Sequence, residues 1–427
     1  MSNVLILGSG GREHAIAWSV KKSSEVANLF CMPGNAGTSQ LAQNISGNIN
    51  DNQEVLKIIN DYKIDYTIIG PENPLENGIV DYLEENDCKV FGPSKYASQL
   101  ETSKIFARKF MEKYQIPQPS FFECSSEEGV ISVSTKLGFP IVLKADGLAA
   151  GKGVIICNNQ YELDNALDVM FTNKKFGSAA NVLSVEECLK GEELSIFVIT
   201  DGVNYKILNS AQDHKRIYDN DKGPNTGGMG AYCPAPLFTN ELKSKVENKI
   251  IKPTIEGMIN EGYPYKGFLY IGIMIVDNNP FVIEFNARLG DPEAQALIPM
   301  LNDSLYPIIK SVINKEVDSL DILSKDGFTV TVVLASNGYP EKYQSNMLIN
   351  GLIDKSFLVF HSGTKLIDNQ YYSNGGRVVN VIGQDDNLKG AILNAYNNVE
   401  KISFENMYYR KDIGKKGLAY LKGINNE

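Results

Sequence analysis

The sequence predicts a chain of several domains, in which an α/β region is followed by α+β regions. Three observations lead to this prediction. The chain has 427 residues, enough for roughly two to four compact units. Its N-terminal part repeats a short apolar run, a Gly- or Pro-rich turn and a helical stretch. Beyond residue 103, strand-like alternation is mixed with longer helical stretches.

The N-terminal region, residues 1–103, is expected to form an open sheet of parallel strands. Short apolar runs, several with β-branched residues, occupy residues 4–7, 29–32, 66–69 and 90–91. Runs of this kind that alternate with helices are typical of strands buried on both faces of a sheet. Ligands bind such sheets at the carboxyl ends of the strands, where the turns after all four runs should lie.

Residues 104–318 are expected to form an α+β region and residues 319–427 a small mixed α/β module. In the central region a helical pattern at residues 103–114 is ended by Pro117 and Pro119, and further helices are expected near 161–171 and 241–260. Central strands are expected at 141–146, 154–157, 194–200, 268–276 and 281–286. The C-terminal module should contain strands at 328–336, 357–360 and 377–382, then a helix at about 387–400.

Composition excludes several classes of protein. A net charge of −10 argues against broad contact with a nucleic-acid backbone. The longest uncharged apolar run, residues 268–276, has nine residues, whereas a membrane-spanning helix needs about 20. The N-terminus has no basic stretch before its apolar run, so we expect no secretory signal and a cytoplasmic location. The six cysteines have no metal-ligand spacing and are expected to be reduced.

The turn at residues 8–13, GSGGRE, follows a predicted strand and opens a helix. A dinucleotide fingerprint would need a third glycine where Glu13 stands, so hydride chemistry with NAD is weakly supported. Glycine amides at a helix N-terminus could still hold one phosphate, with Arg12 beside it. The alternative is a tight turn that serves packing alone.

Residues 144–153, KADGLAAGKG, lie between two predicted strands. Three residues separate Gly147 from Gly151, and Gly153 follows Lys152, so the segment is not a Walker A loop. Small residues with a lysine at each end nevertheless suit a triphosphate, because backbone donors come close and two ammonium groups balance charge. A surface hairpin with solvated lysines is the alternative.

Residues 282–288, VIEFNAR, suggest a metal site. With a strand period of two, Val282, Glu284 and Asn286 would share one face. Carboxylate and carboxamide oxygens suit a hard cation such as Mg²⁺ that bridges to phosphate. An exposed strand face is the alternative.

The segment QDHKR at 212–216 leads into the glycine-rich stretch at 223–231, which could be a mobile lid or a flexible connection. The three histidines, His14, His214 and His361, have no serine or cysteine nucleophile at motif spacing. A histidine-based catalytic triad is therefore not expected.

Together these segments resemble the phosphoribosylamine-glycine ligases, or glycinamide ribonucleotide synthetases, of the ATP-grasp superfamily. Ten segments occur in the family's order, namely GGREHA (10–15), PGNAGT (33–38), GPE (70–72), KADGLAAGKGV (144–154), QDHKR (212–216), GPNTGGMGAY (223–232), GFLY (267–270), EFNARLGDPE (284–293), NGGR (374–377) and RKDIG (410–414). The resemblance implies an N-terminal sheet of the pre-ATP-grasp type, a two-lobed ATP-grasp domain with a hairpin lobe at about 120–193, and a C-terminal module.

The resemblance also implies a reaction. Enzymes of this family join glycine to 5-phosphoribosylamine while ATP becomes ADP and phosphate, through a glycyl phosphate, and they act in purine biosynthesis. No protein nucleophile is needed, which agrees with the missing triad. Catalysis would then rest on positioning and on stabilising the charge of the transferring phosphoryl group.

Site residues follow from the resemblance by position. Those implied for ATP are Lys104, Lys144, Gly147, Gly151, Lys152, Gly153, Glu186 (adenine amino group), Glu187, Leu189 and Glu193 (ribose hydroxyls). Those implied for glycine and phosphoribosylamine are Gly10, Gly11, Asn35, Gly37, Asp213, Arg288, Gly290 and Asp291. Glu284 and Asn286 would hold Mg²⁺ or Mn²⁺, while Arg288, on the same face if the strand continues, and Lys144 would be catalytic.

The sequence departs from the family pattern in a few places. Ala287 and Leu289 stand where the family often has cysteine and phenylalanine, and residues 268–274 contain no acidic residue for a second Mg²⁺. Two alternatives remain: another ATP-grasp carboxylate-amine ligase or carboxylase, and a nucleotide-binding regulator without turnover. The expected partners are ATP, glycine and phosphoribosylamine, with no nucleic acid and no membrane, and the chain is expected to be a monomer.

Overall fold

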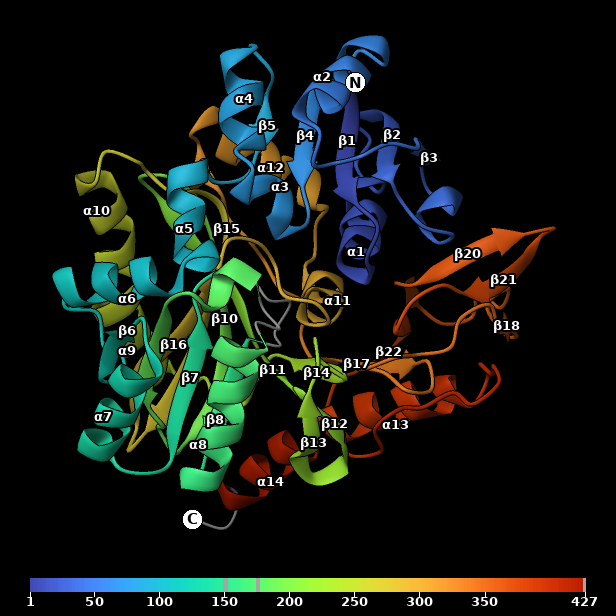
Figure 1. Ribbon diagram of the computed structural model, residues 1–427. Coiled ribbons are helices and arrows are strands. Elements are labelled where there is room, and N and C mark those ends of the chain that lie inside the picture. Colours follow the sequence, from blue (N-terminus) through green and yellow to red (C-terminus); the bar gives the residue numbers. More distant parts are fainter. Residues whose placement is uncertain (149–152, 174–176, 425–427) are drawn as a thin grey trace.

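The computed structural model of the chain describes residues 1–148, 153–173 and 177–424 (Figure 1). An N-terminal parallel sheet, a large antiparallel sheet and a small four-stranded sheet surround a central region that contains α11 (Glu293–Leu297). The predicted combination of α/β and α+β regions is confirmed.

Five parallel strands form the N-terminal sheet, in the order β3-β2-β1-β4-β5. Its elements are β1 (Ser2–Gly8), α1 (Gly11–Val20), β2 (Val26–Pro33), β3 (Gln43–Asn44), α2 (Asn52–Asp61), β4 (Tyr66–Ile69), α3 (Glu72–Glu76), α4 (Ile79–Glu85), β5 (Val90–Phe91) and α5 (Lys95–Thr102). The strand order reverses between β1 and β4, and a ligand crevice opens at such a switch point in open α/β sheets. Gly10 follows β1 and Glu72 begins α3 after β4, so both lie at this crevice.

The large sheet has eight antiparallel strands in the order β16-β15-β10-β11-β14-β17-β22-β19. Its strands are β10 (Glu192–Asp201), β11 (Tyr205–Asp213), β14 (Gly230–Cys233), β15 (Lys266–Val276), β16 (Asn279–Asn286), β17 (Phe328–Ala335), β19 (Val359–His361) and β22 (Arg377–Asp385). Strands from both sides of the boundary expected at residue 318 therefore share one sheet, because β14 pairs with β17. The domain boundaries near 103 and 318 stay predictions.

A separate lobe is built on a four-stranded antiparallel sheet in the order β6-β9-β7-β8. It comprises β6 (Phe121–Cys124), α7 (Glu127–Leu137), β7 (Ile141–Ala145), β8 (Val154–Cys157), α8 (Gln160–Leu167) and β9 (Leu183–Glu187). Leu143, Leu163 and Val185 belong to a core cluster that is confined to residues 124–185. The lobe thus packs on its own core beside the large sheet.

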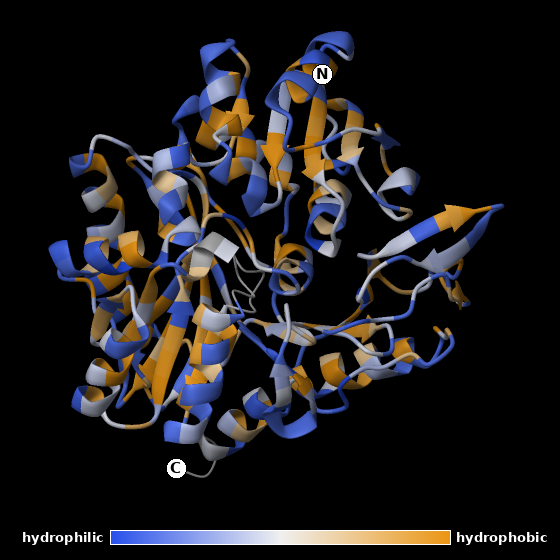
Figure 2. Cartoon of the chain, in the orientation of Figure 1, coloured by the Kyte–Doolittle hydropathy of each residue, from blue (hydrophilic) through white to orange (hydrophobic). Residues whose placement is uncertain are grey.

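The remaining elements cover these sheets or extend from them. They are α6 (Lys104–Lys113), β12 (Arg216–Tyr218), β13 (Lys222–Asn225), α9 (Asn240–Val246), α10 (Lys252–Asn260), α12 (Leu305–Asn314), β18 (Leu348–Ile349), β20 (Thr364–Ile367), β21 (Gln370–Ser373), α13 (Leu388–Val399) and α14 (Lys415–Ile424). In Figure 2 the strands are mainly hydrophobic, whereas the outer helices show hydrophilic residues toward the outside. None of the helices within the described residues is long and apolar enough to cross a membrane.

Close packing joins the first turn of α1 to the C-terminal module. A Cβ atom at Gly11 would lie 2.5 Å from Ser362 Oγ and from Gln295 Nε2, and closer still to Asn380 Nδ2. The Asn35 amide donates to the backbone oxygen of His361 at 2.8 Å, and its own oxygen accepts from the Gly37 amide at 2.8 Å. These residues hold the N-terminal sheet against the loop after β19.

Replacing Gly11 by alanine is expected to destabilise the chain by about 1–3 kcal/mol, because the added methyl group overpacks this contact. The matched control is Gly129→Ala in α7, where a Cβ atom would make only ordinary contacts of 3.5 Å or more. That change should be neutral or stabilise by up to about 1 kcal/mol. Thermal unfolding of both variants checks the prediction, and equal midpoints would contradict it.

Candidate active site

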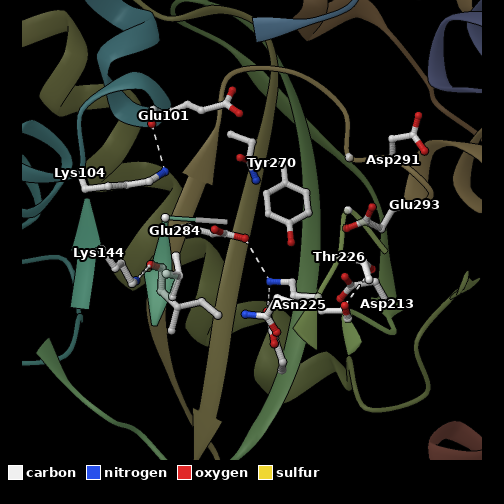
Figure 3. A pocket seen from close by; sticks show the side chains of 18 of the residues that line it. Glu101, Lys104, Lys144, Asp213, Asn225, Thr226, Tyr270, Glu284, Asp291 and Glu293 are labelled. Carbon is white, nitrogen blue, oxygen red and sulfur yellow. Dashed lines mark hydrogen bonds and ion pairs between the residues drawn. The ribbon is translucent and has the colours of Figure 1, made fainter. Parts of the chain in front are cut away.

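A cavity of about 700 Å³ lies where the N-terminal sheet, the small lobe, the large sheet and the C-terminal module meet (Figure 3). Each part contributes side chains, for example Glu72 from the N-terminal region, Lys144 from the lobe, Glu284 from the large sheet and Arg377 from the module. The carboxyl ends of the N-terminal strands open into it, as expected for an α/β sheet.

Fifteen of the residues implied by sequence line this cavity. They are Gly10, Lys104, Lys144, Gly147, Gly153, Glu186, Glu187, Leu189, Glu193, Asp213, Glu284, Asn286, Arg288, Gly290 and Asp291. Gly11, Asn35 and Gly37 are not among its lining residues; they lie at the junction with the C-terminal module. Gly151 and Lys152 lie outside the described residues.

Glu13 changes the interpretation of the N-terminal turn. Its carboxylate accepts hydrogen bonds from the Gly10 amide at 2.6 Å and from Arg12 Nε at 2.6 Å. Gly8 and Gly70 also pack closely against this side chain. An internal carboxylate therefore occupies the position over the turn where we expected a ligand phosphate. The prediction that Gly10 and Gly11 hold this phosphate is not supported by the arrangement.

The expected alternation along β16 is wrong at Val282. The pairing of β15 with β16 shifts between Gly272 and Ile273, so that Ile283 forms a β-bulge. Val282 packs in the core with Phe285, whereas Ile283, Glu284 and Asn286 line the cavity. Glu284 and Asn286 do face the same space, as predicted, but Val282 does not share it.

Glu186 is held inside the chain rather than presented to the cavity as a free acceptor. Arg108 donates to both carboxylate oxygens at 2.8 and 2.6 Å, and Lys144 Nζ lies 2.9 Å from Oε2. Ser184 Oγ adds a third donor at 2.9 Å. Burial alone would raise the pKa of Glu186, but Lys144 and Arg108 lower it. With both oxygens engaged, this carboxylate is poorly placed to read an adenine amino group, contrary to the expectation.

The bulge at Ile283 also positions two cations. Its backbone oxygen accepts hydrogen bonds from Lys144 Nζ at 2.8 Å and from Arg108 Nη2 at 2.9 Å. Burial lowers the pKa of Lys144 to about 8, although Glu186 counteracts this effect. Lys104 lies above Lys144 in Figure 3, on the same side of Glu284, and its ammonium donates to the Glu101 backbone oxygen at 3.1 Å. Two lysines thus border the Glu284 carboxylate.

Arg288 lies between two carboxylates from the N-terminal region. Its Nε donates to Glu72 Oε2 at 3.1 Å, and its Nη2 is 2.7 Å from Glu101 Oε1. Glu101 also accepts from the Ala287 amide at 2.6 Å. β16 ends at Asn286, so Arg288 does not continue the strand face as expected. Its position is fixed instead by this pair of acids.

The two carboxylates respond differently to their surroundings. Burial would raise the pKa of Glu72, but Arg288 and Arg12 lower it to about 2. For Glu101 burial outweighs the attraction of Arg288 and raises the pKa. Glu72 is therefore ionised over the whole neutral range, whereas the pKa of Glu101 stays raised even with Arg288 beside it.

Asp213, Glu293 and Tyr270 form an acidic corner of the cavity (Figure 3). Burial raises the pKa of Asp213 well above its usual range, and Glu293 and Glu193 add to the effect. Burial likewise raises the pKa of Glu293. A corner of this kind favours a positively charged ligand group, since a cation would relieve the repulsion between the acids.

Arg377 connects the C-terminal module to the cavity. Its Nη1 donates to the backbone oxygens of Gly227 at 2.7 Å and Asp291 at 2.6 Å, and lies 3.2 Å from Asp291 Oδ1. Tyr339 Oη accepts from the Gly227 amide at 3.0 Å. The glycine-rich stretch, considered above as a mobile lid, is thus held to the module and ends in β14.

Several functional side chains were missed because no local pattern marks them. Arg108 and Glu101 lie in helices without a recognisable motif. Lys215 and Arg377 lie in the segments QDHKR and NGGR, but were not singled out as site residues. The acid of GPE, Glu72, could have been found because it follows a buried parallel strand directly.

A divalent cation would find suitable donors at Glu284 and Asn286, which present a carboxylate and a carboxamide oxygen to the cavity. Burial would raise the pKa of Glu284, but Lys215, Lys104 and Lys144 lower it to about 2, so its carboxylate is ionised. Among the described residues, no group of three or more His, Cys, Asp or Glu side chains could hold a metal ion. The two donors fit a cation that takes its other ligands from phosphate and water.

Comparison with known families gives three consecutive matches. The N domain of phosphoribosylglycinamide synthetase matches residues 2–101, its ATP-grasp (A) domain residues 102–294 and its C domain residues 329–416.

Named relatives match along nearly the whole chain. The phosphoribosylamine–glycine ligase of Caldanaerobacter subterraneus is 42% identical over 96% of this chain and 99% of its own length. The Pseudomonas aeruginosa ligase is 42% identical over 99% of each chain. The human trifunctional purine biosynthetic protein adenosine-3 is 41% identical, and the match covers 99% of this chain but 42% of that longer protein.

Solved structures show the same pattern. The phosphoribosylamine–glycine ligase of Thermotoga maritima superimposes with a TM-score of 0.85 at 34% identity, over 96% of this chain and 100% of that one. A biotin carboxylase from Campylobacter jejuni gives 0.72 at 15% identity, over 100% of this chain and 97% of that one, which shows a shared fold alone.

Proposed function

The chain belongs to the phosphoribosylglycinamide synthetase family, and we propose that it catalyses the reaction for which its relatives are named, the ATP-dependent joining of phosphoribosylamine to glycine. The observation that carries the proposal is the match to three consecutive domain models, together with one cavity to which all three parts contribute. The product would be glycinamide ribonucleotide, and the pathway purine biosynthesis.

The chemistry requires activation of a carboxylate. ATP transfers its γ-phosphoryl group to a glycine carboxylate oxygen, which gives ADP and glycyl phosphate. The amine of phosphoribosylamine then attacks the acyl carbon and releases phosphate, and the amine proton passes to solvent or a nearby base. Because no bond to the protein forms, the side chains act by positioning and by balancing charge.

ATP would lie between the lobe and the large sheet. Val142, Val154, Ile156, Leu189, Met274 and Ile283 supply an apolar lining suited to a flat base. Since the Glu186 carboxylate is engaged internally, the adenine edge falls to backbone groups at residues 187–189, where β9 ends and the following loop begins. Glu193 would bind the ribose hydroxyls, and Lys104, Lys144 and the hairpin from Gly147 to Gly153 would border the phosphates.

Glu284 and Asn286 are the residues that would hold Mg²⁺ or Mn²⁺. The cation would neutralise charge on the β- and γ-phosphate oxygens when bound. On the protein side, Glu284 keeps its carboxylate ionised through the surrounding lysines, and the bulge at Ile283 aims it into the cavity.

Glycine and phosphoribosylamine would occupy the end of the cavity near the N-terminal sheet. Arg288, held by Glu72 and Glu101, would face the glycine carboxylate and the acyl phosphate. Asp213 lies in the acidic corner and would bind the glycine ammonium. Gly290, Asp291 and Gly10 would border the phosphoribosylamine.

The proposal is tested by mixing the protein with ATP, Mg²⁺, glycine and freshly generated phosphoribosylamine. ADP release should require both co-substrates, because phosphoryl transfer is productive only when the acyl phosphate is captured. ADP release that does not depend on glycine would withdraw the assignment.

The kcat/KM for ATP should depend on pH because the charge of Lys144 does. Because its pKa is about 8 in the free chain, the ammonium form that attracts phosphate is lost as pH rises through this value. We expect kcat/KM for ATP to fall by up to about tenfold per pH unit above pH 8. Lys144→Arg should have a flatter profile, since a guanidinium stays charged. A wild-type profile without a decline near pH 8 would contradict the prediction.

We further propose that the chain acts as a monomer in the cytoplasm, as expected from its sequence. Sedimentation of the purified protein tests the first point, and a fluorescent fusion in the source cell tests the second.

A further inference from the structure

Lys215 joins two acidic side chains across the large sheet. Its ammonium donates to Glu193 Oε1 and to Glu284 Oε1, the latter at 3.1 Å. Glu193 belongs to β10 and Glu284 to β16, and β15 lies between these strands. One side chain from the segment after β11 therefore neutralises acids from two other strands.

The main chain of Lys215 is fixed, whereas its side chain has room to move. Its backbone oxygen accepts from the Thr226 amide at 2.7 Å and from Thr226 Oγ1 at 2.9 Å. The side chain is 31% exposed and lies in the open cavity. An ammonium on a flexible four-carbon stem can therefore leave one anion for another while the backbone stays in place.

The charges make this bridge significant for metal binding. Lys215, Glu193 and Glu284 together carry one net negative charge, and one Glu284 oxygen, Oε1, is already paired with the ammonium. The described residues offer no group of three His, Cys, Asp or Glu ligands that could compensate. A free divalent cation thus meets a small donor set and a competing ammonium.

We propose that Lys215 is an internal counter-cation that makes metal binding conditional on nucleotide. When a triphosphate arrives with its cation, the phosphates attract the ammonium away from Glu284, and the freed carboxylate oxygen becomes available to the metal. Without nucleotide, Lys215 keeps the two acids paired and the metal position closed. This inference rests on the proposed function for the identity of the nucleotide site.

The test measures Mn²⁺ binding to nucleotide-free protein, with free Mn²⁺ followed by electron paramagnetic resonance. Lys215→Met should bind Mn²⁺ roughly tenfold or more tightly than the wild-type chain, because Glu193 and Glu284 lose the ammonium that they share. Lys416→Met is the matched control: it removes a lysine from the lining of the same cavity, but one whose ammonium pairs with Asp221 Oδ2 at 2.6 Å and not with Glu284 or Glu193. Its Mn²⁺ affinity should change by less than about threefold.

Two results would overturn the inference: equal Mn²⁺ affinity in Lys215→Met and the wild-type chain, or an equal gain in Lys416→Met. If the double variant Lys215→Met/Glu284→Gln still binds Mn²⁺ more tightly than the wild-type chain, the inference is also overturned, because the metal then binds somewhere other than Glu284. Thermal unfolding verifies that each variant is folded, and Lys215→Gln replaces the methionine variant if it is not. The measurement contains no ATP or glycine, so failure here leaves the ADP-release assay as an independent test of function.

Discussion

Replacing Glu284 by alanine is expected to lower the rate of glycine- and phosphoribosylamine-dependent ADP release by about a thousandfold or more. The carboxylate is the ionised member of the proposed metal pair, and it also anchors Lys215 at 3.1 Å. Its loss removes a ligand and leaves the lysines beside it without their common anion. Steady-state ADP release at saturating ATP, compared with the wild-type chain, measures the effect.

The control for this change lies in the same hairpin of strands. Asp277 is exposed in the turn between β15 and β16, and Asp277→Asn should leave the rate of ADP release within about twofold. Equal thermal unfolding midpoints for both variants would show that the hairpin is intact. A Glu284→Ala protein with wild-type turnover would remove the metal site from the proposal.

The fold could be predicted where strands are buried on both faces. Residues 66–69 and 90–91 were expected as strands and are strands with the same bounds, because all their side chains are buried. Residues 154–157 also have the expected bounds, although β8 is an edge strand and Ile156 is exposed. β9, β11 and β13 were not predicted, since polar residues or glycines interrupt the pattern. The continuous sheet across residue 318 depends on pairing between β14 and β17, which are far apart in sequence.

The site could be predicted only in part, for a similar reason. Glu284, Asn286 and Lys144 stand out because a short segment places them beside one another or beside glycines. Partners such as Glu72 and Arg288, 216 residues apart, meet only through the tertiary fold. Periodicity also could not reveal the bulge at Ile283, because neither glycine nor proline marks it. Ion pairs between residues far apart in sequence, and local irregularities such as this bulge, could therefore not be predicted from the sequence.

Replacing Arg288 by methionine is expected to abolish ligation and also to destabilise the chain by about 3–5 kcal/mol, because a buried carboxylate loses its partner. Glu101 has 3% of its side chain exposed, and its carboxylate otherwise accepts from the Ala287 amide at 2.6 Å. Thermal unfolding and ADP release, measured on the same preparations, separate the two effects. Unchanged stability in Arg288→Met would contradict the role given to this pair.

The double variant Arg288→Met/Glu101→Gln separates catalysis from folding. Burial already raises the pKa of Glu101, and loss of Arg288 removes the attraction that opposes this rise. A carboxyl whose pKa is raised in the folded state favours folding below that pKa and costs stability as pH increases through it. Arg288→Met should therefore lose stability as pH rises above the usual range of a glutamate carboxyl. With glutamine at 101 the acid is gone, so stability should recover and lose this pH dependence. Ligation should not return, because the guanidinium that would face the acyl phosphate is still missing; recovery of activity would show that Arg288 acts on the fold alone.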